Sequence, residues 1–226
     1  MQLIDSNNIT TLCFFDCHAT LLSSEIATCR TAVGAETDVL RRLGDFGRYL
    51  STRSTPPNRA IVLQTNTGWS CYIDNDRIGG IPRSLMTSIA ERLRIRAIGL
   101  VMMDQVECNK LNRPFSMGFA YEDGRSGCVI SRSVMVTKDI GNWSFDTDGA
   151  PIPEEVTEAY LRKRTADRLG PTELETLLIQ MGITSSLPIK LYDDEWFELS
   201  WRWQASGDSK ETSHFLTRLW ELAKRS

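Results

Sequence analysis

The sequence is short of the residues and motifs on which catalytic assignments usually rest. Only two of its 226 residues are histidines, His18 and His214. The Gly-x-Ser-x-Gly turn of serine hydrolases is missing, and neither His-x-x-x-His nor Cys-x-x-Cys occurs. A Cys–His nucleophile pair would need one of the histidines beside a cysteine, and no spacing favours such a pair. We therefore expect no catalytic residue, no cofactor and no metal site.

A large excess of one charge and long hydrophobic runs are missing as well. Twenty-six Lys and Arg oppose 29 Asp and Glu, a formal net charge of −3, whereas nucleic-acid-binding proteins usually carry a basic excess. No apolar run approaches the roughly eighteen residues of a membrane helix, and no basic segment precedes an apolar signal region at the N-terminus. We expect a cytoplasmic protein with no membrane partner and no nucleic-acid partner. An early arginine group fits a solvated face better than a nucleic-acid site: Arg41, Arg42, Arg48, Arg53 and Arg59.

The cysteines number six, and their even count invites a disulfide interpretation. The chain is long and lacks an export signal, which favours reduced thiols instead. Cys13 and Cys17 are the pair most suggestive of a metal, but in an extended strand they lie about 13 Å apart, too far for one ion. We expect six free thiols: Cys13, Cys17, Cys29, Cys71, Cys108 and Cys128.

Hydrophobic periodicity predicts an α+β fold, a mostly antiparallel sheet with helices packed on one face. We interpret residues 1–226 as a single domain, in which residues 1–57 form a less regular N-terminal subregion and residues 51–59 a loop. Helical patterns follow Pro82 over residues 85–93 and occupy residues 153–169, 171–181 and 211–224, with a helical turn or two over residues 37–43. The expected strands span residues 11–15, 60–64, 69–73, 97–103, 115–121, 128–136, 143–145 and 197–203.

One segment resembles a known group of proteins. It contains Trp143-Ser-Phe145, Gly149-Ala-Pro-Ile-Pro153, Tyr160-Leu-Arg-Lys-Arg164 and a helix that ends Met181-Gly-Ile183. Over about residues 143–183 the chain resembles poorly characterised bacterial proteins that look similar to immunity partners of secreted polymorphic toxins. The resemblance implies a cytoplasmic protein that binds a cognate toxin and neutralises it by occluding its active site. No catalytic residue comes with it.

An acidic stretch around a tryptophan is the best candidate for a partner-binding site. Strand alternation places Asp194, Trp196 and Glu198 on the face opposite Phe197 and its apolar row. Tryptophan is enriched at interface hot spots, and carboxylates around it would steer a basic partner. Alanine at these three positions should then weaken binding without unfolding the protein. In the alternative, the final helix covers Trp196 and the acids only solubilise a loop. The predicted partner-binding residues are Asp193, Asp194, Glu195, Trp196 and Glu198.

Two other interpretations stay open at this point. The chain could be a small soluble enzyme with an unrecognised active site on the sheet, built from Asp, Arg or Cys side chains and lying in a deep polar pocket. The arginine-rich stretch of residues 160–168 could bind an anion or a partner, although a solvated helix with internal ion pairs explains it more simply.

Overall fold

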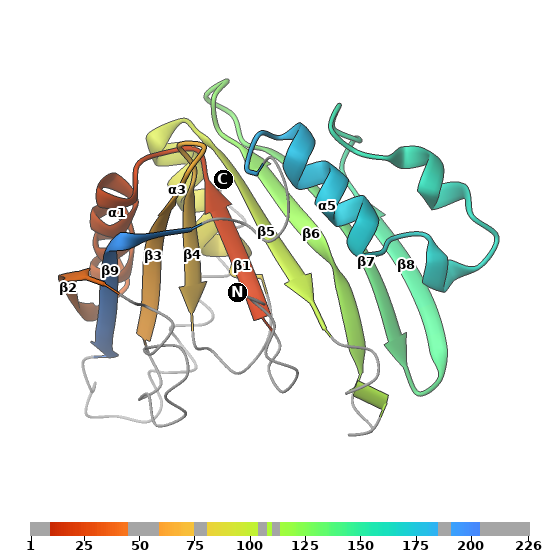
Figure 1. The fold of residues 1–226 in the computed structure, drawn as a ribbon, viewed down its shortest axis with the longest axis horizontal. Coiled ribbons are helices and arrows are strands. Elements are labelled where there is room, and N and C mark those ends of the chain that lie inside the picture. Colours follow the sequence, from red (N-terminus) through yellow and green to blue (C-terminus); the bar gives the residue numbers. More distant parts are fainter. Residues whose placement is uncertain are drawn as a thin grey trace.

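The computed structural model describes residues 10–44, 59–74, 81–103, 108–109, 114–184 and 191–203 (Figure 1). Its centre is a nine-stranded antiparallel sheet in the order β2-β9-β3-β4-β1-β5-β6-β7-β8. The strands are β1 (Thr10–Phe15), β2 (Ala35–Leu43), β3 (Arg59–Thr65), β4 (Ser70–Asp74), β5 (Arg96–Met102), β6 (Phe115–Asp123), β7 (Ile130–Asp139), β8 (Asn142–Asp148) and β9 (Leu191–Trp203).

Three α-helices and two 3₁₀ turns accompany the sheet in the described ranges. They are α1 (Ala19–Ala32), α3 (Arg83–Leu93), α5 (Pro171–Gln180), η1 (Thr157–Leu161) and η2 (Thr165–Asp167). Helices α1 and α3 share one hydrophobic cluster with one side of the sheet, and α5 belongs to the cluster on the other side. In Figure 1, α5 lies on the near face in front of β6 and β7, toward the β8 edge of the sheet.

The expected α+β fold with an antiparallel sheet is confirmed, with one difference in the layers. Helices cover both faces of the sheet, not one face. The reason is visible in β1, where the consecutive residues Phe14 and Phe15 are both fully buried and belong to opposite clusters. Because neighbouring side chains of a strand point to opposite faces, a strand that is apolar at consecutive positions needs cover on both sides.

Most of the expected strands and two of the helices are present. The two hairpins, β3–β4 and β6–β7, form with the predicted partners, and β5 is a central strand paired on both sides. Pro82 caps α3, and Gly182, with a φ of 74°, follows α5 in the left-handed conformation that glycine adopts readily. These segments were predictable because their hydrophobic periods are local properties of the sequence.

The prediction of a helical turn over residues 37–43 is wrong. These residues form most of β2, an edge strand that pairs antiparallel with β9 along its whole length, from Ala35 opposite Trp203 to Leu43 opposite Glu195. Val39, Leu40 and Leu43 have the spacing of a helical turn, but main-chain hydrogen bonds to a distant strand decide the conformation of this segment. Sequence propensity is a weak guide where such tertiary pairing is available.

The helix predicted over residues 153–169 is also replaced, here by η1 and η2 with extended residues between them. Arg162 ends η1 in an extended conformation, with φ −58° and ψ 141°. The carboxylate of Glu155 is buried in this segment without a continuous helix. Its contacts are described below. Helix α1 was not expected, because its Thr- and Ser-rich sequence has only a narrow apolar stripe.

The N-terminal part of the chain joins the same sheet as the rest, since β1 lies at its centre and β2 at one edge. Predictions for residues 51–58 and 211–224 fall outside the described residues. In the described ranges, no helix combines the length and apolar character needed to cross a membrane.

The β7–β8 hairpin contains a strained isoleucine. Ile140 and Gly141 form a two-residue loop with φ values of 46° and 83°, between Asp139 and Asn142, which pair across the hairpin. Positive φ at both positions is what a type I′ turn requires, and Asn-Gly is its preferred sequence. This conformation costs a β-branched residue about 1–2 kcal/mol. Ile140 is 93% exposed, so packing does not offset that cost.

We therefore expect Ile140→Asn to raise the free energy of unfolding by about 1 kcal/mol. The measurement is the midpoint of urea unfolding. It is compared between variants for which the unfolding free energy depends on urea concentration with the same slope. Ile140→Val keeps the β-branch and should leave the midpoint where it is. Equal midpoints for the Asn and Val variants would contradict the strain.

Candidate functional site

The predicted acidic stretch and the early arginine group meet at one margin of the sheet. Arg41 and Arg42 lie on β2, and Glu195 and Glu198 lie on the neighbouring β9. Arg41 donates to Glu195 at 2.6 Å, and Arg42 donates twice to one carboxylate oxygen of Glu198, at 2.8 and 3.0 Å. Arg59 on β3 approaches the other oxygen of Glu198 at 3.8 Å. The carboxylates are therefore largely neutralised by arginines of the same chain.

Two of the predicted partner-binding residues are buried. Trp196 is 5% exposed, lies opposite Leu63 of β3, and donates from its indole Nε1 to the carbonyl oxygen of Gly44 at 3.0 Å. Glu198 is 6% exposed between its arginine partners. The expectation that alanine at these positions leaves the fold intact is therefore corrected, because both side chains are part of the packed interior. Alternation is confirmed, since Phe197 belongs to the cluster on the opposite face.

The remaining predicted residues lie in the N-terminal half of β9. Glu195 is partly exposed, and Asp193 and Asp194 belong to β9, while their side chains lie outside the described residues. Opposite Glu195, its partner strand exposes Leu43, which is 77% exposed. We use the term open margin for the surface formed by Arg41, Leu43 and Glu195, whose side chains share one face of the sheet. It combines exposed apolar area with an ion pair of both signs.

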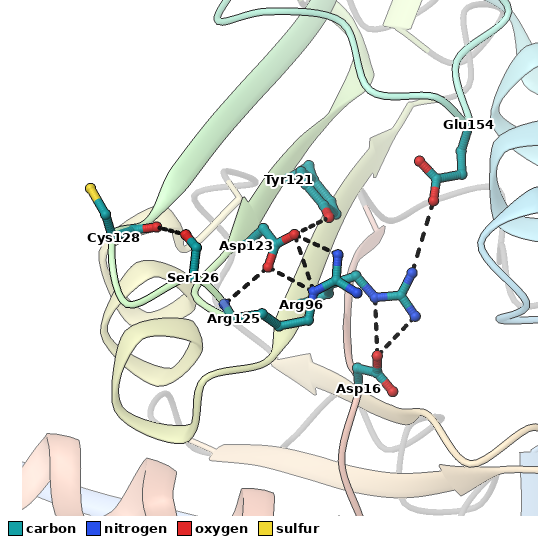
Figure 2. A network of polar contacts seen from close by, with 8 residues as sticks. All are labelled: Asp16, Arg96, Tyr121, Asp123, Arg125, Ser126, Cys128 and Glu154. Atoms are coloured by element: carbon teal, nitrogen blue, oxygen red, sulfur yellow. Dashed lines mark hydrogen bonds and ion pairs between the residues drawn. The ribbon is translucent and has the colours of Figure 1, made fainter.

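A second polar cluster lies at the end of the sheet where β1, β5 and β6 meet (Figure 2). Arg96, the first residue of β5, donates to Asp16 at 2.9 and 3.0 Å and lies 3.9 Å from Glu154. Its guanidinium also lies 5.0 Å from the centre of the Trp69 ring. Figure 2 shows Arg96 between the two carboxylates, so one side chain joins the end of β1 to the segment that precedes η1.

The other half of this cluster centres on Asp123. Arg125 donates to it through its side chain, at 2.7 Å for the shortest contact, and through its main chain, while the Tyr121 hydroxyl donates at 3.0 Å. The Arg125 hydrogen bonds hold the pKa of Asp123 at about 2, and burial followed by the Asp123 charge raises the pKa of Tyr121. These shifts fix Asp123 as an anion and Tyr121 as a neutral phenol, which suits a structural tie.

We expect the Asp123 network to stabilise the protein above about pH 4 and to lose that contribution as the pH falls toward 2. The sign follows from a pKa that is lower in the folded state than its ordinary value of 3.8. Because Arg125 is half exposed and water screens the pair, we expect about 1 kcal/mol. Urea unfolding at about pH 5 and about pH 2.5 measures it, and Asp123→Asn should flatten the difference. The exposed control Glu158→Gln should keep the wild-type difference in unfolding free energy between the two pH values. If the two variants show the same difference, the assignment is refuted.

The Asp16-Cys17-His18 sequence does not form a nucleophilic site. Burial, and next the Asp16 charge, raise the pKa of Cys17 to about 12, so the thiol stays protonated at neutral pH. His18 is exposed and accepts a hydrogen bond through Nδ1 from the Thr20 main chain at 3.3 Å, which caps α1. None of the six cysteines, all of which the structure describes, is paired in a disulfide, as predicted.

The segment that carries the family resemblance is anchored by one buried ion pair. The side chains of Arg132, on β7, and Glu155 are 3% and 0% exposed, and two hydrogen bonds of 2.9 Å join them. Glu155 also accepts from the Tyr160 hydroxyl and from the Ile152 main chain, and Arg132 donates to the Gly149 carbonyl. The Gly149–Tyr160 motif residues are therefore explained by the packing of this segment against β7.

The arginine-rich stretch that follows is tied mainly to its own surroundings. Arg162 lies 2.7 Å from Glu173 of α5 and donates to the Asp167 carbonyl, and Arg168 donates back to the Arg162 carbonyl. Arg164 is the most exposed of the group and lies 3.8 Å from Asp167. The internal ion pairs of the simpler interpretation are present, on 3₁₀ turns instead of a helix.

Among the residues that the structure describes, no three His, Cys, Asp or Glu side chains come together as a metal site. Comparisons with protein-family models, with curated proteins and with solved structures found no match for this chain. The fold and site define an antiparallel α+β protein with an open margin. The resemblance to immunity proteins stays a prediction, as does the alternative of a small enzyme.

Proposed function

We propose that this chain is an immunity-type protein that binds a cognate bacterial toxin and occludes its active site. The observation that carries the proposal is the open margin, where Leu43 is exposed beside the Arg41–Glu195 ion pair. Apolar side chains rimmed by charges are typical of protein-binding surfaces. Full burial of a leucine side chain contributes about 1.5–3 kcal/mol, so Leu43 provides a useful anchor for a partner.

Charge at the margin supports a basic toxin surface. Glu195 belongs to the acidic stretch that starts at Asp193 and is partly exposed, and a partner that brings its own cations can compete with Arg41 for its carboxylate. Complementary charge increases the rate of association and disfavours wrong partners. If the toxin is a nuclease, these carboxylates can occupy the place of its anionic substrate. The resemblance of residues 143–183 adds support from an independent part of the chain.

The test uses proteins encoded by the genes that neighbour this one, each expressed in a bacterial host with and without this chain. We expect one neighbour to be toxic alone and harmless in the presence of the wild-type chain. Leu43→Asp and Glu195→Arg should weaken binding of that toxin about tenfold or more, because they remove the apolar anchor and reverse the steering charge.

Leu161→Asp is the matched control, since Leu161 is 86% exposed on η1, away from β2 in the fold. This variant should protect as well as the wild type. Toxic neighbours that the chain fails to neutralise would overturn the proposed function. Protection that survives both Leu43→Asp and Glu195→Arg would remove the open margin from it.

A further inference from the structure

Strand β2 is an edge strand of an unusual composition. It pairs with β9 on one side and ends the order of described strands on the other. Seven of its nine residues, Glu36 and the six from Asp38 to Leu43, are exposed. Exposed edges of this length invite pairing with another strand, and proteins usually block them with a bulge, a proline or cover. The pairing of β2 with β9 is regular throughout.

The charges of β2 are separated along its length. Glu36 and Asp38 lie in the first half, Arg41 and Arg42 lie in the second half, and Val39 is the middle residue. A strand with this pattern is complementary to itself when two copies run antiparallel, because each acidic half then lies beside a basic half. The complementary surface is thus supplied by the chain itself.

We infer that two copies of this chain associate through β2, edge to edge, around a two-fold axis at Val39. Such an axis pairs only residues that point to the same face of the sheet, as antiparallel pairing requires. Val39 then lies opposite Val39 of the second copy, and Glu36 opposite Arg42 of the second copy, twice by symmetry. Opposite charges at directly facing positions of antiparallel strands stabilise the pairing.

The contacts of Arg42 within one chain fit this arrangement. Its two hydrogen bonds to Glu198 use two of the five N–H groups of a guanidinium, and its side chain is half exposed. Leu40, the neighbour of Arg42 on the same face, pairs with Glu198 in the register of β2 and β9. In the dimer Arg42 would lie between two carboxylates, Glu198 of its own chain and Glu36 of the second copy. The faces of the open margin stay accessible, so the inference does not rest on the toxin proposal.

Sedimentation equilibrium of the full chain over a wide concentration range tests the inference. The wild type should approach twice the 25.5 kDa mass of one chain. Val39→Lys places two ammonium groups at the axis, and Glu36→Arg places arginines opposite each other; each should weaken self-association about tenfold or more. Thr147→Lys, an exposed position on the opposite edge strand β8, is the matched control and should remain dimeric.

Mixing provides a further test of the register. Glu36→Arg and Arg42→Glu should each be monomeric alone and should associate when mixed, because both facing pairs then regain opposite charges. If Arg42→Glu fails to fold beside Glu198, the Val39 and Glu36 variants still decide. A wild type that stays at 25.5 kDa, or a dimer that survives Val39→Lys and Glu36→Arg, would overturn the inference. A monomeric wild type whose Val39→Lys variant loses protection would assign the edge to the toxin instead.

Discussion

Replacing Arg132 with methionine should reduce the free energy of unfolding by about 3–5 kcal/mol. The substitution leaves Glu155, which is 0% exposed, as a buried carboxylate without its cation. The Tyr160 hydroxyl and the Ile152 main chain still donate to it, but neither supplies a positive charge. Breaking a buried pair on one side is costly for this reason, even though the intact pair adds little net stability.

Three comparisons make this prediction specific, two of them read from the urea midpoint and the third from amide exchange. Arg125→Met removes an arginine that also holds a carboxylate, but one whose side chain is 55% exposed, and should cost about 1 kcal/mol or less. Glu155→Gln with Arg132→Met removes both charges and should recover part of the loss. Loss of the β8–η1 packing should appear as faster amide exchange around Gly149. Similar costs for Arg132→Met and Arg125→Met would contradict a buried anchor.

The elements that the sequence predicted are those whose pattern is local. Strand β5 is a continuous apolar run, and β9 alternates apolar and polar residues, so a window of a few residues identifies each. Strand β2 could not be identified in this way, because its exposed residues follow no period that burial imposes. Its conformation depends on pairing with β9, whose register partners lie more than 150 residues away along the chain.

The candidate site shows the same limit. Both halves of the open margin were singled out in the sequence, the arginines around Arg41 and the acids around Glu195, but as separate features. A signal was available, because two consecutive cations on one segment and Glu195-x-x-Glu198 on another could complement each other across a pair of strands. Using that signal would have required β2 to be recognised as a strand first. Without it, Trp196 and Glu198 looked exposed, and the structure shows both sides of β9 to be packed at these positions.

The segment of residues 153–169 illustrates a different limit. Acidic residues after Pro153 are typical of a helix start. Nothing in the sequence indicated that Glu155 forms an ion pair with Arg132 instead. The structure has this buried ion pair followed by two 3₁₀ turns in place of the helix. The features behind the family resemblance are thus accounted for by packing, and the surface available to a partner has to be sought elsewhere, at the open margin.

Trp196→Ala should cost about 3–5 kcal/mol of unfolding free energy, the range for removing a buried aromatic side chain. The indole is 5% exposed, packs in the cluster that contains Leu63, and satisfies the Gly44 carbonyl. Trp196→Phe keeps most of the apolar volume and loses the hydrogen bond to Gly44, an exposed residue, so we expect an intermediate cost that comes mainly from the smaller ring.

The comparison with Leu43→Ala separates core from interface at this margin. Leu43 is 77% exposed, so its truncation should change the free energy of unfolding by no more than about 0.5 kcal/mol. Toxin binding should respond in the reverse order, since Leu43 belongs to the surface that a partner covers, whereas Trp196→Phe should leave binding near the wild-type value. A stable Trp196→Ala protein that no longer binds would restore Trp196 as the partner's direct contact and would move the binding surface from the open margin to the indole itself.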